Sequence, residues 1–178
     1  MVEEAVRGGV RFVLLRERDL GETAFARLAE RLAGALPREV ILSIHGRPAV
    51  AAALHAGLHL PEGAPPPAAG PSWHGRSVHG SEAASRARRD GVAYIVAGTI
   101  FPSVGKPGIP PAGVEGLRAM CAAAHPVPVY AIGGLSAARA GEVRAAGAHG
   151  VAVVGAILEA DAPEAAARAL VKALGGLD

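Results

Sequence analysis

The chain has 178 residues, of which 51% are hydrophobic and 3% aromatic, and its formal net charge is +2. This length indicates one domain, residues 1–178, with an aliphatic core, and the small charge argues against nucleic acid as a partner. The single cysteine excludes an intramolecular disulfide, and the absence of a signal-peptide layout or of an apolar run near ~20 residues predicts a cytoplasmic location without a membrane partner.

Hydrophobic periodicity predicts helices and strands in alternation along the chain. Segments with apolar residues at helical spacing are 2–7, 23–35, 49–56, 81–90 (with Ser81 as its N-cap), 114–124, 137–146 and 163–174. Short apolar runs that end at polar or glycine residues lie between them and are expected to be strands: 10–15, 40–44, 58–60, 73–79, 92–97, 127–132 and 151–154. Proline and glycine mark 61–71 and 98–111 as loops.

This alternation predicts a parallel sheet with helices outside it. An open, doubly wound sheet is one way to arrange such units. A (β/α)₈-type barrel is favoured, because polar residues stand at the carboxyl ends of nearly all strands, where barrel proteins carry their functional groups.

Two strand ends late in the chain have the composition of a phosphate site. The strand over 127–132 runs into Gly133-Gly134, and the next strand runs into Gly155-Ala156. Glycine lets the backbone approach a ligand closely, and a helix start behind it offers free N–H groups. Adjacent units of this kind can share one phosphate, although a turn that needs a positive φ explains the glycines equally well.

Three cationic side chains are candidates for binding an anion. Arg16 and Arg18 alternate at a strand end and therefore share one face, and Lys106 lies in a glycine-flanked loop that could close over a phosphate. The alternative for all three is solvated surface charge. The loop is not a P-loop, because the GxxxxGK[ST] spacing is absent.

Two of the seven histidines are candidates for acid–base chemistry. His45 ends a strand, and His79 follows Ser77 with one residue between, so that Ser77 and His79 can line one pocket. His59 lies inside a short strand, where packing is the simpler role. No histidine and carboxylate spacing matches a metal motif, and no aspartate cluster is present to hold Mg²⁺.

Taken together, these motifs resemble a known family, that of thiamine phosphate synthase and its relative TenI, a thiazole tautomerase. The likeness covers nearly the whole chain and rests on motifs in order: Leu14-Leu15-Arg16-Glu17-Arg18, Ile44-His45-Gly46-Arg47, Leu58-His59-Leu60-Pro61, Gly75-Arg76-Ser77-Val78-His79, Phe101-Pro102 with Lys106-Pro107-Gly108, Ala131-Ile132-Gly133-Gly134 and Gly150-Val151-Ala152-Val153-Val154. The resemblance implies a small phosphorylated heterocycle, a thiazole phosphate, as ligand.

The motifs favour the TenI branch. The synthases carry metal-binding aspartates in Asn-Asp-Arg and Gly-Gln-Asp-Asp, where this chain has His45-Gly46-Arg47 and Pro61-Glu62-Gly63-Ala64. Without those carboxylates the Mg²⁺ that balances a diphosphate leaving group has no ligands. We therefore expect a TenI-like tautomerase without metal or cofactor. A thiamine phosphate synthase and a non-catalytic binding or regulatory protein stay open as alternatives.

The resemblance also assigns roles and exposes two departures. Phosphate is expected at Gly133, Gly134, Gly155, Ala156 and Lys106, and the remaining substrate groups at Arg16, Arg18, Ser77 and Thr99. Thr99 stands where TenI-type enzymes carry a histidine, so His45, His79 or a water would move the proton. The family's first strand has no counterpart, so the strand from Val10 should lack an outer neighbour, which leaves a gap, or an edge covered by residues near the N-terminus or by the second subunit of a homodimer.

Overall fold

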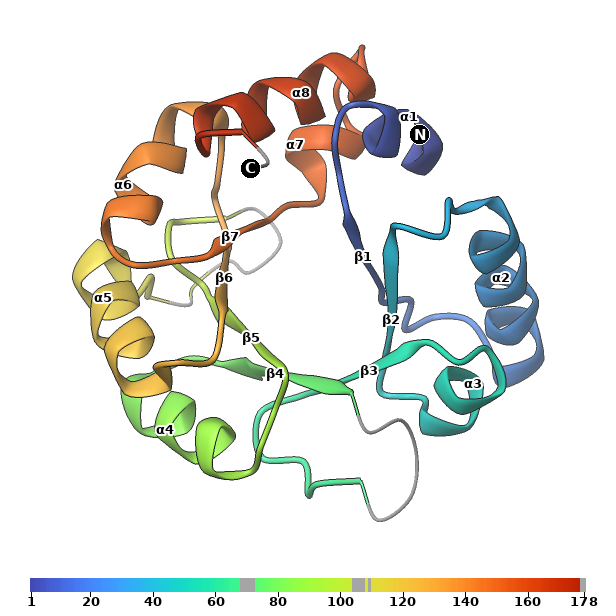
Figure 1. Ribbon diagram of the computed structural model, residues 1–178, viewed down its shortest axis with the longest axis horizontal. Coiled ribbons are helices and arrows are strands. Elements are labelled where there is room, and N and C mark those ends of the chain that lie inside the picture. The colour runs from blue at the N-terminus through green and yellow to red at the C-terminus, as the bar shows by residue number, and fades with distance from the viewer. Residues whose placement is uncertain (68–72, 104–107, 109, 177–178) are drawn as a thin grey trace.

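The computed structural model describes residues 1–67, 73–103, 108 and 110–176, and in these residues helices and strands alternate as expected (Figure 1). The order of elements is α1 (Val2–Arg7), β1 (Phe12–Leu15), α2 (Glu22–Ala35), β2 (Ile41–His45), α3 (Pro48–Ala53), β3 (Gly57–Leu60), β4 (His74–Val78), α4 (Ser81–Arg89), β5 (Tyr94–Gly98), α5 (Gly113–Ala124), β6 (Val129–Ile132), the 3₁₀ turn η1 (Ala137–Arg139), α6 (Ala140–Ala145), β7 (Gly150–Ala152), α7 (Gly155–Leu158) and α8 (Pro163–Ala173).

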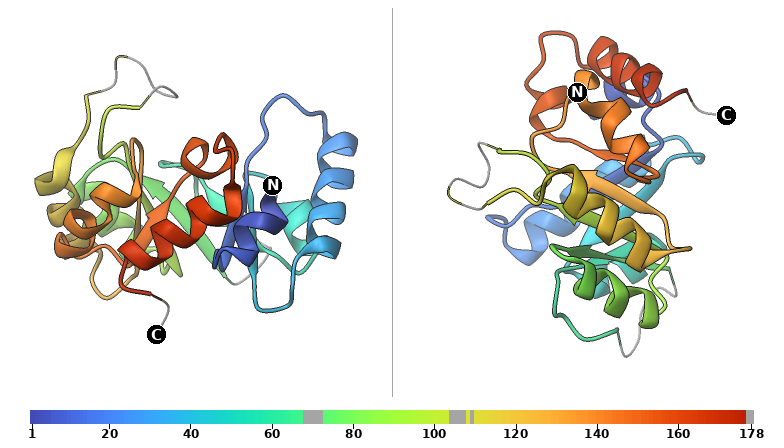
Figure 2. Two further views of the ribbon diagram at one scale, coloured as in Figure 1. Left: turned by 90° about the horizontal axis from the view of Figure 1, so that it is seen from above. Right: turned by 90° about the vertical axis from the view of Figure 1, so that its left-hand side faces the viewer.

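The strands form one parallel sheet of seven strands in the order β1-β2-β3-β4-β5-β6-β7. The sheet curls into an incomplete barrel with the helices on its outer side (Figures 1 and 2). The strands are parallel and joined by crossover connections, so the carboxyl ends of all strands lie at the same end of the incomplete barrel. The predicted barrel type with seven strands is confirmed.

Alternation along the strands separates an aliphatic outer layer from an aromatic interior. Ile95 and Ala97 of β5 point outward into a buried cluster with α4 and α5. Tyr94 points inward, where its ring lies 4.8 Å from that of Phe12 and 5.0 Å from that of Trp73. A Cβ at Gly75 would run into the Tyr94 ring. Four aromatic side chains therefore contact one another in the interior of the curled sheet: Phe12, Trp73, Tyr94 and Tyr130.

The predicted absence of a strand beside β1 is confirmed for the described residues, where β1 pairs only with β2 and β7 only with β6. The helices bridge this break on the outside. Helix α1 packs on α8, and Ala5, Ile157, Ala167 and Leu170 form one buried cluster there. Arg7 reinforces the contact through an ion pair with Glu164 at 3.1 Å.

Two local expectations are wrong. Ser81 is not the N-cap of α4: Gly80 takes that position with an extended backbone, and no side chain caps the helix. The segment 137–146 is not one helix but the 3₁₀ turn η1 followed by α6. The short helix α7 begins at Gly155, where a helix start was expected behind the second glycine.

Candidate functional site

Arg16, His45 and His59 come together at the carboxyl ends of β1, β2 and β3. Leu15 pairs with Ile44, so Arg16 and His45 follow at neighbouring positions. His45 in turn pairs with His59, with 5.7 Å between ring centroids. The three side chains alternate with residues of the outer aliphatic layer and therefore face the interior of the sheet. Sequence analysis expected Arg16 and His45 here, whereas His59 was assigned to packing.

Arg16 and Arg18 bring positive charge to the carboxyl ends of these strands. Burial lowers the pKa of His45 first, and the charges of Arg16 and Arg18 lower it further. Partial burial and then the charge of Arg18 also lower the pKa of Arg16. Among the ion pairs of the described residues, none involves Arg16 or Arg18. Positive charge without an internal counter-ion suits an anionic ligand.

A buried hydrogen-bond chain leads from this site into the interior. His59 Nε2 lies 2.9 Å from Ser77 Oγ, and His59 Nδ1 lies 3.0 Å from the Tyr94 hydroxyl. That hydroxyl lies 2.9 Å from Ser43 Oγ. Burial, followed by the charges of His45, Arg16 and Arg76, lowers the pKa of His59 to about 3, and burial raises that of Tyr94. Both groups are therefore uncharged near neutral pH.

His79 lies apart from this chain, at the exposed rim. Its Nδ1 is 2.7 Å from Glu62 Oε2, and Arg86 approaches the other oxygen of the same carboxylate at 4.0 Å. Ser77 is held by His59, so Ser77 and His79 make different contacts although one residue separates them. That these two side chains line one pocket stays a prediction.

The Gly133-Gly134 corner is required by backbone geometry. Both residues have positive φ, 104° and 61°, and a Cβ at Gly133 would lie 2.5 Å from Thr99 Cγ2. Thr99 is buried against this corner. The glycines thus have the structural role that a turn predicts, while no backbone hydrogen bond from their N–H groups to another described residue is present. Those N–H groups are available to a ligand.

The second corner lies at the neighbouring strand end. Ile132 pairs with Ala152, so the residues after β6 and β7 emerge side by side. Gly155 and Ala156 open α7, and their N–H groups likewise donate no backbone hydrogen bond within the described residues. Lys106, the third expected phosphate ligand, lies outside the described residues.

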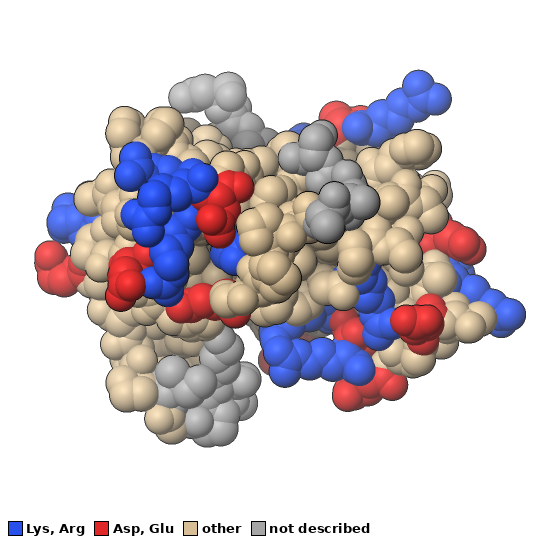
Figure 3. Space-filling view, turned by 90° about the horizontal axis from the view of Figure 1, so that it is seen from below, with Lys and Arg blue, Asp and Glu red and all other residues tan. Residues whose placement is uncertain are grey.

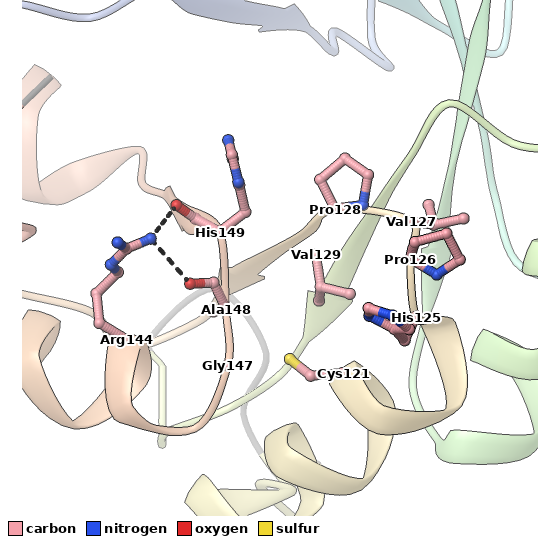
Figure 4. A pocket seen from close by; sticks show the side chains of 10 residues that line it. All are labelled: Cys121, His125, Pro126, Val127, Pro128, Val129, Arg144, Gly147, Ala148 and His149. Atoms are coloured by element: carbon pink, nitrogen blue, oxygen red, sulfur yellow. Dashed lines mark hydrogen bonds between the residues drawn. The ribbon is translucent and has the colours of Figure 1, made fainter. Parts of the chain in front are cut away.

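Two pockets in the described residues open at the opposite, amino end of the strands. One, of 360 Å³, lies between α5, the start of β6 and the loop before β7, where Arg144 Nη1 donates to the carbonyls of Ala148 and His149 (Figure 4). The other, of 810 Å³, is lined by residues such as Ile41, Gly57 and Trp73. Neither contains a residue expected to bind substrate.

The donor set at the carboxyl end does not fit Mg²⁺, the ion that the family resemblance implies for a synthase. In phosphate sites Mg²⁺ is usually held through one or two carboxylates, and here Gly46 and Gly63-Ala64 stand at the positions to which the family resemblance gives aspartates. Glu62, the carboxylate closest in sequence to the missing motif, instead contacts His79.

The curled parallel sheet, with helices outside and polar side chains at one end, defines the protein as a parallel α/β barrel protein. A family profile described as thiamine monophosphate synthase matches residues 1–157. The chain belongs to this family.

Individual relatives agree with this assignment over nearly the full chain. A thiamine-phosphate synthase of Thermus thermophilus is 38% identical, covering 98% of this chain and 88% of the relative. One of Chlorobium luteolum is also 38% identical, covering 96% and 84%. The solved thiamine phosphate pyrophosphorylase of Pyrococcus furiosus superposes with a TM-score of 0.87 at 28% identity, covering 98% and 87%.

These relatives correct the functional expectation. A TenI-like tautomerase was expected from the missing metal carboxylates, yet the similar proteins are named thiamine-phosphate synthases. The motifs around His45 and Glu62 therefore did not indicate the branch. The transferase that was kept as an alternative is the supported one.

On the face in Figure 3, Lys and Arg side chains gather in one patch at the left and in smaller groups at the right, with Asp and Glu side chains beside them. Within the described residues, no helix combines the length and the apolar character needed to cross a membrane.

Proposed function

We propose that the protein is a transferase that joins a pyrimidine diphosphate to a thiazole phosphate, forming thiamine phosphate and releasing diphosphate. The observation that carries this proposal is the 38% identity to thiamine-phosphate synthases over nearly the whole chain. The electropositive carboxyl end of the sheet supports it, because both substrates are anionic and the leaving group carries several negative charges.

In this proposal Arg16 and Arg18 hold the diphosphate. Neither guanidinium has an ion-pair partner among the described residues, and a guanidinium matches phosphate oxygens in a forked geometry. His45, neutral because of burial and the nearby arginines, offers one N–H donor to the same group. Developing negative charge on the departing diphosphate then meets fixed positive charge.

The two glycine corners are proposed to hold the phosphate of the thiazole substrate. They follow paired strands, and the N–H groups of Gly133, Gly134, Gly155 and Ala156 have no backbone acceptor within the described residues. Thr99, buried against Gly133, fixes the shape of the first corner and does not contact the ligand in this proposal. His79, paired with Glu62 at the rim, has no chemical step assigned to it.

The direct test is formation of thiamine phosphate from the two substrates by the purified protein, measured together with released diphosphate. Equal amounts of both products are expected from the unmodified chain. Arg16→Gln is expected to lower kcat/KM at least ~10-fold, since an anion loses a charged hydrogen bond, whereas Arg31→Gln, on the exposed side of α2, should not. Binding of both substrates without product would overturn the proposal and favour a non-catalytic binding protein.

A further inference from the structure

Four side chains from four consecutive strands form a single line of hydrogen bonds through the interior. Ser43 on β2 contacts Tyr94 on β5, Tyr94 contacts His59 on β3, and His59 contacts Ser77 on β4, at 2.9, 3.0 and 2.9 Å. Ser43, His59 and Tyr94 are 0%, 1% and 2% exposed. Ser77 is partly exposed and stands next to the last residue of its strand.

The Ser77 end of this line of hydrogen bonds faces the candidate site. Gly75 points inward, since a Cβ there would meet Tyr94, and Ser77 lies two residues further along the same strand on the same face. The charge of Arg16 acts on His59, the neighbour of Ser77 in the line. The hydroxyl of Ser77 is therefore the member of this line that a ligand at the carboxyl end can reach.

A neutral imidazole gives such a line a direction. One ring nitrogen carries a hydrogen and donates, and the other accepts. Either Ser43 donates to Tyr94, Tyr94 to Nδ1 and Nε2–H to Ser77, or every bond runs the other way. The two directions differ in which hydroxyl hydrogen is left over at the end of the line.

Burial selects the first direction. If the bonds run from Ser77 toward Ser43, the hydroxyl hydrogen of Ser43 is left over, and Ser43 has no second hydrogen-bond partner among the described residues. A fully buried, unsatisfied hydroxyl is strongly disfavoured. If they run from Ser43 toward Ser77, each buried hydrogen has an acceptor, and the spare hydrogen belongs to partly exposed Ser77.

We infer that Tyr94 and His59 are positioning residues, which keep His59 in its Nε2–H tautomer and thereby leave the Ser77 hydroxyl as a hydrogen-bond donor for an anionic oxygen of the substrate. The inference deepens the proposed function, on which it rests for the identity of that substrate. The Ser77 hydroxyl, held in place by His59, would then be a neutral hydrogen-bond donor beside the charged groups Arg16 and Arg18. With the opposite tautomer of His59, the Ser77 hydroxyl would donate its hydrogen to His59 and could not donate it to the substrate.

The tautomer can be observed directly. In ¹⁵N-labelled protein, long-range proton–nitrogen correlation spectra distinguish Nε2–H from Nδ1–H, and the His59→Gln variant identifies the signals of His59 by their loss. The Nε2–H form is expected near neutral pH, both alone and with saturating inorganic pyrophosphate. A predominant Nδ1–H form would overturn the inference.

Binding of inorganic pyrophosphate tests whether the line acts through Ser77. Tyr94→Phe removes the partner of Nδ1, so neither tautomer of His59 is fully satisfied and Ser77 donates to His59 in part of the molecules; with equal populations the affinity is expected to fall about twofold. In a Ser77→Ala background the same substitution should have no further effect. A loss that persists in that background, or an absence of pyrophosphate binding by the unmodified chain, contradicts the inference.

Two variants separate this role from simple damage to the core. Tyr130→Phe removes the hydroxyl of the neighbouring interior tyrosine, whose ring lies 6.2 Å from that of Tyr94, and should leave the affinity unchanged. Ser43→Ala leaves His59 Nδ1 as the acceptor for the Tyr94 hydroxyl, so the Nε2–H tautomer and the affinity should both be kept, and a loss of affinity with this variant would contradict the inference. The tautomer measured in the unmodified chain keeps the inference falsifiable if Tyr94→Phe folds poorly. Normal pyrophosphate binding with the expected tautomer but no thiamine phosphate would refute the proposed function alone.

Discussion

His45 and His59 lie side by side across the β2–β3 pair, 5.7 Å between ring centroids, and the pKa of each is lowered by burial. Each imidazole also lies in the field of Arg16, which opposes a further positive charge nearby. Two histidines at the end of a sheet therefore serve as neutral hydrogen-bonding groups, and the arginines supply the charge. This division of roles has consequences for stability and binding that can be measured.

The first prediction concerns pH and stability. His59 has a pKa of about 3 in the folded chain and an ordinary value near 6.5 when unfolded, so the unfolded state binds more protons between these limits. The stabilising contribution is present above pH 6.5 and is lost as the pH falls toward 3. At pH 5 the loss amounts to ~2 kcal/mol, measured as the change in unfolding free energy by urea titration.

Variants isolate the contribution of His59 from that of the carboxyl groups. His59→Gln should reduce the loss between pH 7 and pH 5 by this amount, whatever its own effect on stability at pH 7. His125→Gln, at an exposed position after α5, is expected to keep the pH dependence of the unmodified chain. Identical pH dependence in all three proteins would show that His59 titrates normally.

A second prediction concerns the charge of Arg16. Arg16→Gln removes a cation that helps to lower the pKa of His45, so the pKa of His45 should move upward toward its ordinary value. Proton NMR titration of the His45 ring measures this directly. Affinity for pyrophosphate should fall at the same time, and the remaining affinity should depend less steeply on salt. Arg31→Gln serves as the matched control, with no shift at His45.

A third prediction tests the close approach at Gly133. Gly133→Ala forces a side chain into φ 104° and against Thr99, and should lower the unfolding free energy by about 1–3 kcal/mol. Gly34→Ala, inside α2 with no neighbouring atom within 4 Å, should instead raise it by ~0.5–1 kcal/mol. Equal effects of the two substitutions in thermal or urea unfolding would contradict this account of the corner.

The fold could be predicted because strand ends and helix periods are local properties. The seven strands followed from short apolar runs and their order, whereas the unpaired edge of β1 followed from the family resemblance. The line from Ser43 to Ser77 could not, since its members are separated by up to 51 residues and meet only when the sheet curls. One signal was available: Ser43, His45, His59 and Ser77 alternate with aliphatic residues, which marks polar side chains on the inward face.

The branch of the family could not be predicted for a different reason. The substitutions at Gly46 and around Glu62 remove metal carboxylates, which argued against a synthase, whereas the rest of the chain kept the similarity to synthases. The tautomerase prediction depended on those few positions and not on the similarity of the whole chain to the synthases. In the proposed function, the arginines and neutral histidines bind the diphosphate in place of a metal ion held by those carboxylates.

The last prediction concerns the dependence of pyrophosphate binding on Mg²⁺, because this chain lacks the carboxylates that would bind the ion. Because the donor set does not fit Mg²⁺, pyrophosphate affinity in the presence of EDTA should stay high in the unmodified chain, measured by calorimetry with the free ligand concentration corrected for Mg²⁺ complexes. Gly46→Asp should make binding improve on addition of Mg²⁺, since no atom lies within 4 Å of the added Cβ and aspartate tolerates the positive φ of 67° better than most residues. Gly46→Ala controls for the strain of a side chain at this φ. If the unmodified chain binds pyrophosphate only with Mg²⁺, its metal ligands come from groups other than those assigned here, and Arg16 and Arg18 do not replace them.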